Sequence, residues 1–62
     1  MNKYQVGQFG MAHIIIESRG VKRGISCAGH IQMIEKKYIL FKDNDDFLYL
    51  VEKNNFEFKE IV

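Results

Sequence analysis

The sequence predicts a small all-β protein whose five strands form a meander and close into a barrel. Isoleucine occupies positions 14–16, and consecutive β-branched residues favour an extended chain over a helix. Apolar and polar residues alternate from Phe56 to Lys59, which is the period of a strand with one buried face. No segment has the periodicity of an amphipathic helix. We expect the sheet to close into a barrel because an open sheet of five short strands leaves two edges unpaired and an apolar face exposed to water.

The first two expected strands form a hairpin. Residues 12–18 make the first strand, which ends at Arg19-Gly20 because glycine adopts positive φ without a steric penalty. Residues 21–28 make the returning strand, with a bulge or bend at Gly24. We expect Gly29 to end that strand.

The remaining strands follow with short turns. Residues 30–35 and 38–42 are apolar segments separated by Glu35-Lys36-Lys37, and the later segment is apolar on both faces, as in a central strand. Asp43–Asp46 is a turn, because Asp and Asn side chains hydrogen-bond to the backbone two residues on. The last two strands cover residues 47–51 and 56–61 and are connected through Asn54-Asn55.

Length and composition limit the chain to one domain. Its 62 residues are 47% hydrophobic, which is too apolar for intrinsic disorder. We expect residues 12–61 to form the barrel and residues 1–11 to be an N-terminal arm or an extra edge strand. A core of this size leaves little room for an enclosed active site, so we do not expect an enzyme.

The cysteine content and the absence of long apolar runs indicate a cytoplasmic protein. Cys27 is the single cysteine, which excludes an internal disulfide and suits a reducing compartment. No stretch approaches the roughly 20 apolar residues of a membrane span. The first ten residues also lack the apolar segment of a signal peptide.

Part of the chain resembles a known family of small barrels. Residues 21–24 (Val-Lys-Arg-Gly) and residues 29–43, from Gly29 to Asp43, are similar to the middle strands of SH3-like and Sm-like barrels in their glycine, alternating apolar residues and hydrophobic strand ending at Asp. The resemblance implies an SH3-like fold. Sm-type proteins read RNA bases with an Asn that has no counterpart near Lys37-Tyr38, so it does not imply their RNA role.

Two segments approach ligand-binding motifs and fall short of them. Gly24–Ile31 nearly spells a phosphate-binding loop, but it lacks the Lys that reaches the terminal phosphates and the Ser or Thr that holds magnesium. Asp43–Asp46 is similar to the start of a calcium loop, but the pivotal glycine is absent and Asn54 occupies the place of the bidentate glutamate. We expect no bound cofactor.

Cys27, His30 and His13 are the remaining candidates for site chemistry. Cys27 and His30 have zinc-like spacing, and His13 is expected on a neighbouring strand. A structural zinc site needs four ligands, so these three residues leave open only a zinc ion shared across a subunit interface. Cys27 as a nucleophile with either histidine as base is the one catalytic arrangement, and the sequence shows no oxyanion site for it. We expect no catalytic residue and interpret Cys27 as a small buried side chain.

Excess apolar residues favour a protein-binding function. The aromatic and apolar side chains compete for a very small core, and exposed apolar patches mark interfaces. We therefore expect a non-catalytic module that binds another protein and associates with itself, of the kind found among small regulators and inhibitors of phages and mobile elements. The expected interface residues are Tyr4, Phe9, Met11, Phe47 and Tyr49.

Nucleic-acid binding is the alternative. If the Arg19-Gly20 and Lys36-Lys37 turns fall at the same end of the meander, their basic residues form one patch, with Tyr4 or Phe9 available for base stacking. The patch would consist of Arg19, Lys22, Arg23, Lys36 and Lys37. The formal net charge of +1 gives this alternative little support.

Overall fold

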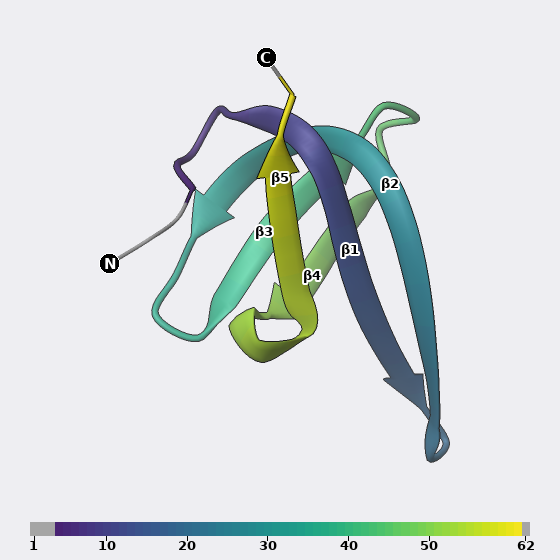
Figure 1. The fold of residues 1–62 in the computed structure, drawn as a ribbon. Coiled ribbons are helices and arrows are strands. Elements are labelled where there is room, and N and C mark those ends of the chain that lie inside the picture. The colour runs from purple at the N-terminus through teal and green to yellow at the C-terminus, as the bar shows by residue number, and fades with distance from the viewer. Residues whose placement is uncertain (1–3, 62) are drawn as a thin grey trace.

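The chain folds into one five-stranded antiparallel sheet (Figure 1). A computed structural model describes residues 4–61. The strands are β1 (Phe9–Ser18), β2 (Val21–Ile34), β3 (Tyr38–Asp43), β4 (Leu48–Glu52) and β5 (Phe56–Glu60), and a 3₁₀ turn, η1 (Lys53–Asn55), joins the last two. The strand order is β4-β3-β2-β1-β5. The all-β class and the total of five strands agree with the sequence prediction, although six candidate segments were assigned to those strands.

The second strand is longer than the sequence predicts. β2 runs through Gly29 without a break and joins the two segments expected on either side of it. Its first part pairs with β1 from Val21 to His30, and its last part pairs with β3 from Gly29 to Ile34. β2 curves strongly between these two partners, so it carries the sheet around the core (Figure 1).

Neighbouring backbones approach closely at two glycines, at Gly29 of β2 against β3 and at Gly10 of β1 against β5. Gly29 is buried and faces Gly10 of β1 on one side and Asp43 of β3 on the other. A Cβ atom at Gly29 would collide with the carbonyl oxygen of Lys42 and come within 2.6 Å of the Cα of Asp43. The sequence predicts a bulge or bend at Gly24, but the pairing of β1 with β2 is regular there, and the register shift of β2 lies between Ile31 and Met33, where it pairs with β3. We call Gly10 and Gly29 the glycine crease.

The core fills the inside of the curved sheet. Its buried residues come from every strand: Ala12, Ile14, Ile31, Ile39, Phe41, Val51 and Phe56. Phe41 and Phe56 have ring centroids 5.8 Å apart, and Phe58 lies 6.2 Å from Phe41. The β5 aromatics thus pack across the interior against β3, far from it in strand order.

The sheet is open. β4 and β5 are its edges, and within residues 4–61 each of them pairs with a single neighbour. The hydrogen-bonded closure expected from the sequence is therefore not present in this part of the chain.

The described part of the predicted N-terminal arm falls partly in β1 and partly in the segment before β1. Residues 9–11 belong to β1, so they are part of the main sheet rather than a separate arm. The preceding segment lies along the end of β2, where Gly7 N–H donates to the carbonyl of Ile31 over 2.8 Å and Ile31 N–H donates to the carbonyl of Gln8 over 3.1 Å. Residues 1–3, which the expected arm also included, lie outside the described residues.

The β1–β2 hairpin extends away from the rest of the sheet (Figure 1). Its turn residues, Arg19 and Gly20, have φ values of 53° and 79°. Positive φ at both central residues is the geometry of a two-residue type I′ turn, whose twist matches the flanking strands. The sequence prediction of a turn at Arg19-Gly20 is confirmed.

The glycine crease yields a stability prediction. Replacing Gly29 with alanine forces a Cβ into the β3 backbone, and we expect Gly29→Ala to lower the free energy of unfolding by about 3 kcal/mol. Gly24→Ala is the matched control, because its Cβ would meet only His13 Nε2 at 3.4 Å and its φ lies outside the left-handed region. We expect that variant to be neutral or up to about 1 kcal/mol more stable. Urea unfolding followed by circular dichroism measures both, and equal effects would contradict this account of the glycine crease.

Candidate functional site

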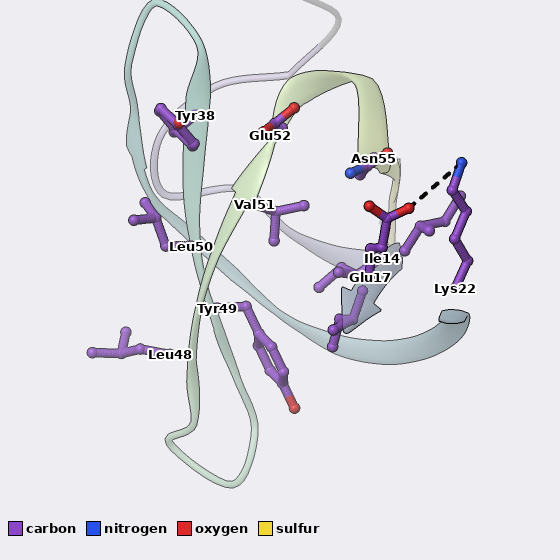
Figure 2. Close-up of a pocket in the computed structure, with 12 residues that line it drawn as sticks. Ile14, Glu17, Lys22, Tyr38, Leu48, Tyr49, Leu50, Val51, Glu52 and Asn55 are labelled. Carbon is purple, nitrogen blue, oxygen red and sulfur yellow. Dashed lines mark ion pairs between the residues drawn. The ribbon is translucent and has the colours of Figure 1, made fainter. Parts of the chain in front are cut away.

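A groove lies between β4 and the part of β1 that follows Ile14 (Figure 2). It has a volume of ≈ 670 Å³. Its walls are Ile14, Ile15, Ile16, Glu17, Lys22, Tyr38, Leu48, Tyr49, Leu50, Val51, Glu52 and Asn55. β5 pairs with β1 only as far as Ile14, and the 3₁₀ turn η1 that precedes β5 lies beside β1, with Asn55 contributing to the wall of the groove.

The side chains of β4 divide between the two faces of the sheet. Tyr49 and Val51 point toward β1, whereas Leu48 and Leu50 point to the opposite side (Figure 2). This is the alternation of a strand, and Val51 belongs to the buried core. Glu17 and Lys22 form an exposed ion pair of 4.0 Å at the rim of the groove, where solvent leaves little net attraction.

An apolar surface covers the outside of β3 and β4. Leu40 pairs with Leu50 on one side and with Met33 on the other, so these three side chains form a row across β2, β3 and β4. Leu50 is 70% exposed and Leu48 is 60% exposed. We call this surface the outer apolar face: Met33, Tyr38, Leu40, Leu48 and Leu50.

The five residues predicted as a protein interface do not gather on one face. Tyr4 packs edge-on against Phe56 with 5.5 Å between ring centroids, and Tyr49 is half-buried. Phe9 is half-buried beside His30, with ring centroids 5.0 Å apart. Met11 and Phe47 are exposed, but they lie on β1 and on the turn before β4.

The outer apolar face was missed because its sequence signal is ambiguous. Residues 47–51 are apolar at every position, so alternation alone cannot tell the outward residues from the inward ones. The pairing of Ile39 with Val51, both buried, is what places Leu48 and Leu50 outside. The sequence-based prediction of the interface selects mainly aromatic residues, whereas the exposed positions of β4 carry leucine.

The basic residues fall into two groups at opposite ends of β2. Arg19, Lys22 and Arg23 lie at the β1–β2 turn, and Lys36 and Lys37 lie at the β2–β3 turn. The expectation that both turns share one end is wrong, because consecutive turns of a meander alternate between its ends. Lys36 and Lys37 instead line a second groove of ≈ 490 Å³ together with Tyr38, Glu52, Lys53 and Asn54.

Cys27 and the two histidines lie on different faces of the sheet. Cys27 is paired with buried Ala12 and packs against the core, and burial, followed by the charge of Asp43, raises the pKa of its thiol. His13 is exposed and its Nδ1 lies 2.8 Å from the hydroxyl oxygen of Ser26. His30, three positions after Cys27, is also exposed. Neither ring shares a face with the sulfur, so the arrangement supplies no thiol–imidazole pair.

Metal-ligand geometry is likewise missing from the described part of the chain. Among residues 4–61 there is no group of three or more His, Cys, Asp or Glu side chains placed to hold one ion. Asp43, at the start of the expected acidic turn, uses both of its carboxylate oxygens within the protein. The prediction of a turn at this place is confirmed.

Asp43 organises the connection between β3 and β4. Its Oδ1 accepts hydrogen bonds from the N–H groups of Asp45 and Phe47, each over 2.9 Å. Its Oδ2 accepts a 3.2 Å hydrogen bond from the hydroxyl of Tyr49, which points into the groove. Desolvation, followed by this hydrogen bond, raises the pKa of Tyr49, so its hydroxyl stays protonated and donates throughout the physiological range.

Comparisons with family models, with curated proteins and with solved structures found no match. No helix within residues 4–61 has the length and apolarity needed to cross a membrane.

The role of Asp43 is open to a direct test. Asp43→Ala removes the acceptor of two backbone N–H groups and of the Tyr49 hydroxyl, and we expect it to lower the free energy of unfolding by about 2 kcal/mol. Asp45→Ala, in the same turn but with its side chain exposed, should change it by no more than about 0.5 kcal/mol. Thermal unfolding of the two variants measures the difference. Equal stabilities would show that the carboxylate does not hold the turn.

Proposed function

We propose that the chain is a non-catalytic interaction module that binds another protein through its outer apolar face, and that its fold is an SH3-like barrel left open between its edge strands, β4 and β5. The exposure of Leu48 and Leu50 is the observation that carries this proposal. Both side chains lie on a sheet surface that also carries Met33 and Tyr38, so the exposed groups are neighbours rather than scattered.

Physical chemistry supports a macromolecular partner for this face. Keeping clustered leucine side chains in water costs free energy, about 25 cal/mol per Å² of apolar surface, and a partner that covers them recovers it. The face is a sheet surface rather than an enclosed cavity, so it suits another protein better than a small molecule. A chain that acts by covering a partner's surface needs no catalytic group, which fits a regulator or inhibitor of the phage or mobile-element type.

Self-association belongs to the same proposal. The outer apolar face is available on every copy of the chain, and apolar faces of this kind pair with themselves when no other partner is present. The small core gives a second reason, because short domains without disulfides often gain stability from a partner subunit.

Charge substitution in the outer apolar face tests the proposal. Leu50→Lys places an ammonium group in the middle of the face, and we expect it to weaken self-association by at least about tenfold in sedimentation equilibrium. The same variant should fail to capture a protein that the wild-type chain captures from lysate of the source cells. Val21→Lys is the matched control, because Val21 is 58% exposed but lies at the tip of the hairpin.

Two results would contradict the proposal. The first is a wild-type chain that is monomeric at high micromolar concentration and captures no protein. The second is association or capture that Leu50→Lys and Val21→Lys reduce equally, since a general effect of added positive charge would then explain the loss.

One observation favours nucleic-acid binding as a second candidate. Lys36, Lys37 and Lys53 line the second groove beside exposed Tyr38, and ammonium groups next to an aromatic ring suit phosphates and a stacked base. The stacking residue would thus be Tyr38, in place of the Tyr4 or Phe9 expected from the sequence. Glu52 in the same groove opposes this binding.

Salt dependence distinguishes the second candidate from the first. For a labelled single-stranded oligonucleotide, binding should weaken as salt rises, with a slope of about −0.7 in log–log form for each phosphate contacted. The double variant Lys36→Glu with Lys37→Glu should reduce that slope by about 1.4. Lys59→Glu, on β5 and outside the second groove, is the control and should leave it unchanged. Binding that tolerates salt, or an equal effect of Lys59→Glu, would remove this candidate.

A further inference from the structure

The groove between β4 and β1 is bounded on both sides by strand edges. β4 is the edge of the sheet, and within the described chain only β3 pairs with it. On the other wall, β5 covers β1 as far as Ile14 and then ends at Phe56. Beyond Ile14, no strand within residues 4–61 pairs with this edge of β1, although the 3₁₀ turn η1 lies beside it. The register of the pairing shows which backbone groups each wall presents.

On the β4 wall, alternate residues point their backbone groups toward the groove. Hydrogen bonds from Asp43 N–H to the Phe47 carbonyl (3.0 Å) and from Lys53 N–H to the Lys37 carbonyl (2.9 Å) flank the pairing of β3 with β4. Hydrogen-bonded and non-hydrogen-bonded pairs alternate along an antiparallel ladder. In the part of β4 that lies between these two hydrogen bonds, every second residue is therefore hydrogen-bonded to β3. The residues whose N–H and C=O groups point away from β3 are Leu48, Leu50 and Glu52.

The β1 wall is arranged in the same way. Ile61 N–H donates to the carbonyl of Phe9 over 3.1 Å, which places the odd-numbered residues of β1 toward β5. Ile15 and Glu17 continue this series beyond the end of β5. Their backbone groups therefore point to the groove, and both residues line it. Leu48, Leu50 and Glu52, whose backbone groups point away from β3, line it as well.

We propose that this groove binds an isolated extended segment of a partner protein as an added strand, which hydrogen-bonds to β4 along one edge and to β1 along the other. This names the mode of recognition for the protein-binding function proposed above and rests on it. Two rows of N–H and C=O groups with strand spacing match the backbone of an extended peptide. The bound segment would close the sheet into a barrel.

The two walls also determine the kind of segment. A strand that already belongs to a sheet has a neighbour on at least one edge, so a folded second copy cannot place its β4 between both walls. A segment that is free on both edges can. Its side chains would face Tyr49 and Val51 on the inner side and Leu48 and Leu50 on the outer side, so we expect apolar residues at successive positions (Figure 2).

Peptide selection provides the probe. Random peptides displayed on phage are selected against the full-length chain, and the best is synthesised with a fluorophore for anisotropy. We expect selected sequences with runs of β-branched and aromatic residues and no proline. N-methylation removes one backbone donor at a time. Because successive N–H groups point to opposite walls, methylation at neighbouring central positions should in each case weaken binding by about tenfold.

A proline variant tests the β4 wall from the protein side. Glu52 has φ −65° and ψ 142°, which proline adopts without strain, and its N–H points away from β3. Glu52→Pro therefore removes one donor from the groove and leaves the ladder to β3 in place. We expect the selected peptide to bind this variant about tenfold more weakly and to bind Glu52→Ala, which keeps the N–H, as tightly as the wild type. Circular dichroism of both variants checks that the sheet is intact.

The proposal is overturned if no selected peptide binds, or if the peptide binds Glu52→Pro as tightly as it binds Glu52→Ala. It is also overturned if N-methylation weakens binding only at every second position, because the peptide then pairs with a single edge. Finally, loss of a wild-type dimer on Glu52→Pro would overturn it, because a second copy of the chain would then be the occupant of the groove. The outer apolar face is tested separately. Capture that depends on Leu50 in the absence of any peptide binding would leave the protein-binding proposal in place and remove only this one.

Discussion

The close approach of backbones at the glycine crease is the constraint on which the rest of the structure depends. Gly29 pairs with both Gly10 and Asp43, and the neighbouring chain occupies the space where a Cβ would stand. Without side chains at these positions, β3 can lie close to β2 and β5 can lie close to β1, and the curved sheet encloses its own apolar face. That enclosure lets the aromatic residues of β5 pack against Phe41 of β3, which a flat sheet would keep apart.

The curved sheet also carries the surfaces that we assign to binding. The groove lies between the edge of β4 and the part of β1 that follows its pairing with β5, and no strand within residues 4–61 fills it. Curvature places Tyr49 and Val51 inside and leaves Leu48 and Leu50 in solvent (Figure 2). The outer apolar face and the groove are therefore two sides of one edge strand, which is why β4 is central to both proposals.

The sequence predicts the local elements well and their arrangement in part. The isoleucine run, Arg19-Gly20 and Asp43–Asp46 each report their own backbone preference, and the structure has a strand and two turns there. The prediction that Gly29 ends a strand is wrong, because the sequence does not distinguish a glycine that ends a strand from one that allows a neighbouring backbone to approach closely. The exposed face of β4 was equally hidden, since every residue from Phe47 to Val51 is apolar and only cross-strand register separates the two faces. Closure of the barrel could not be predicted, because it requires the edge strands β4 and β5 to pair with each other, and no local sequence pattern reports that pairing.

Amide hydrogen exchange by NMR tests most directly whether β4 and the part of β1 that follows Ile14 present free edges to one groove. The account predicts alternation in the free chain: slow exchange at Tyr49 and Val51, which bond to β3, and fast exchange at Leu48, Leu50 and Glu52. On β1, Ile14 and Ile16 should exchange slowly, and Ile15 and Glu17 should exchange fast. Uniform protection along both segments would show that the two edges are already paired, and would contradict the open groove.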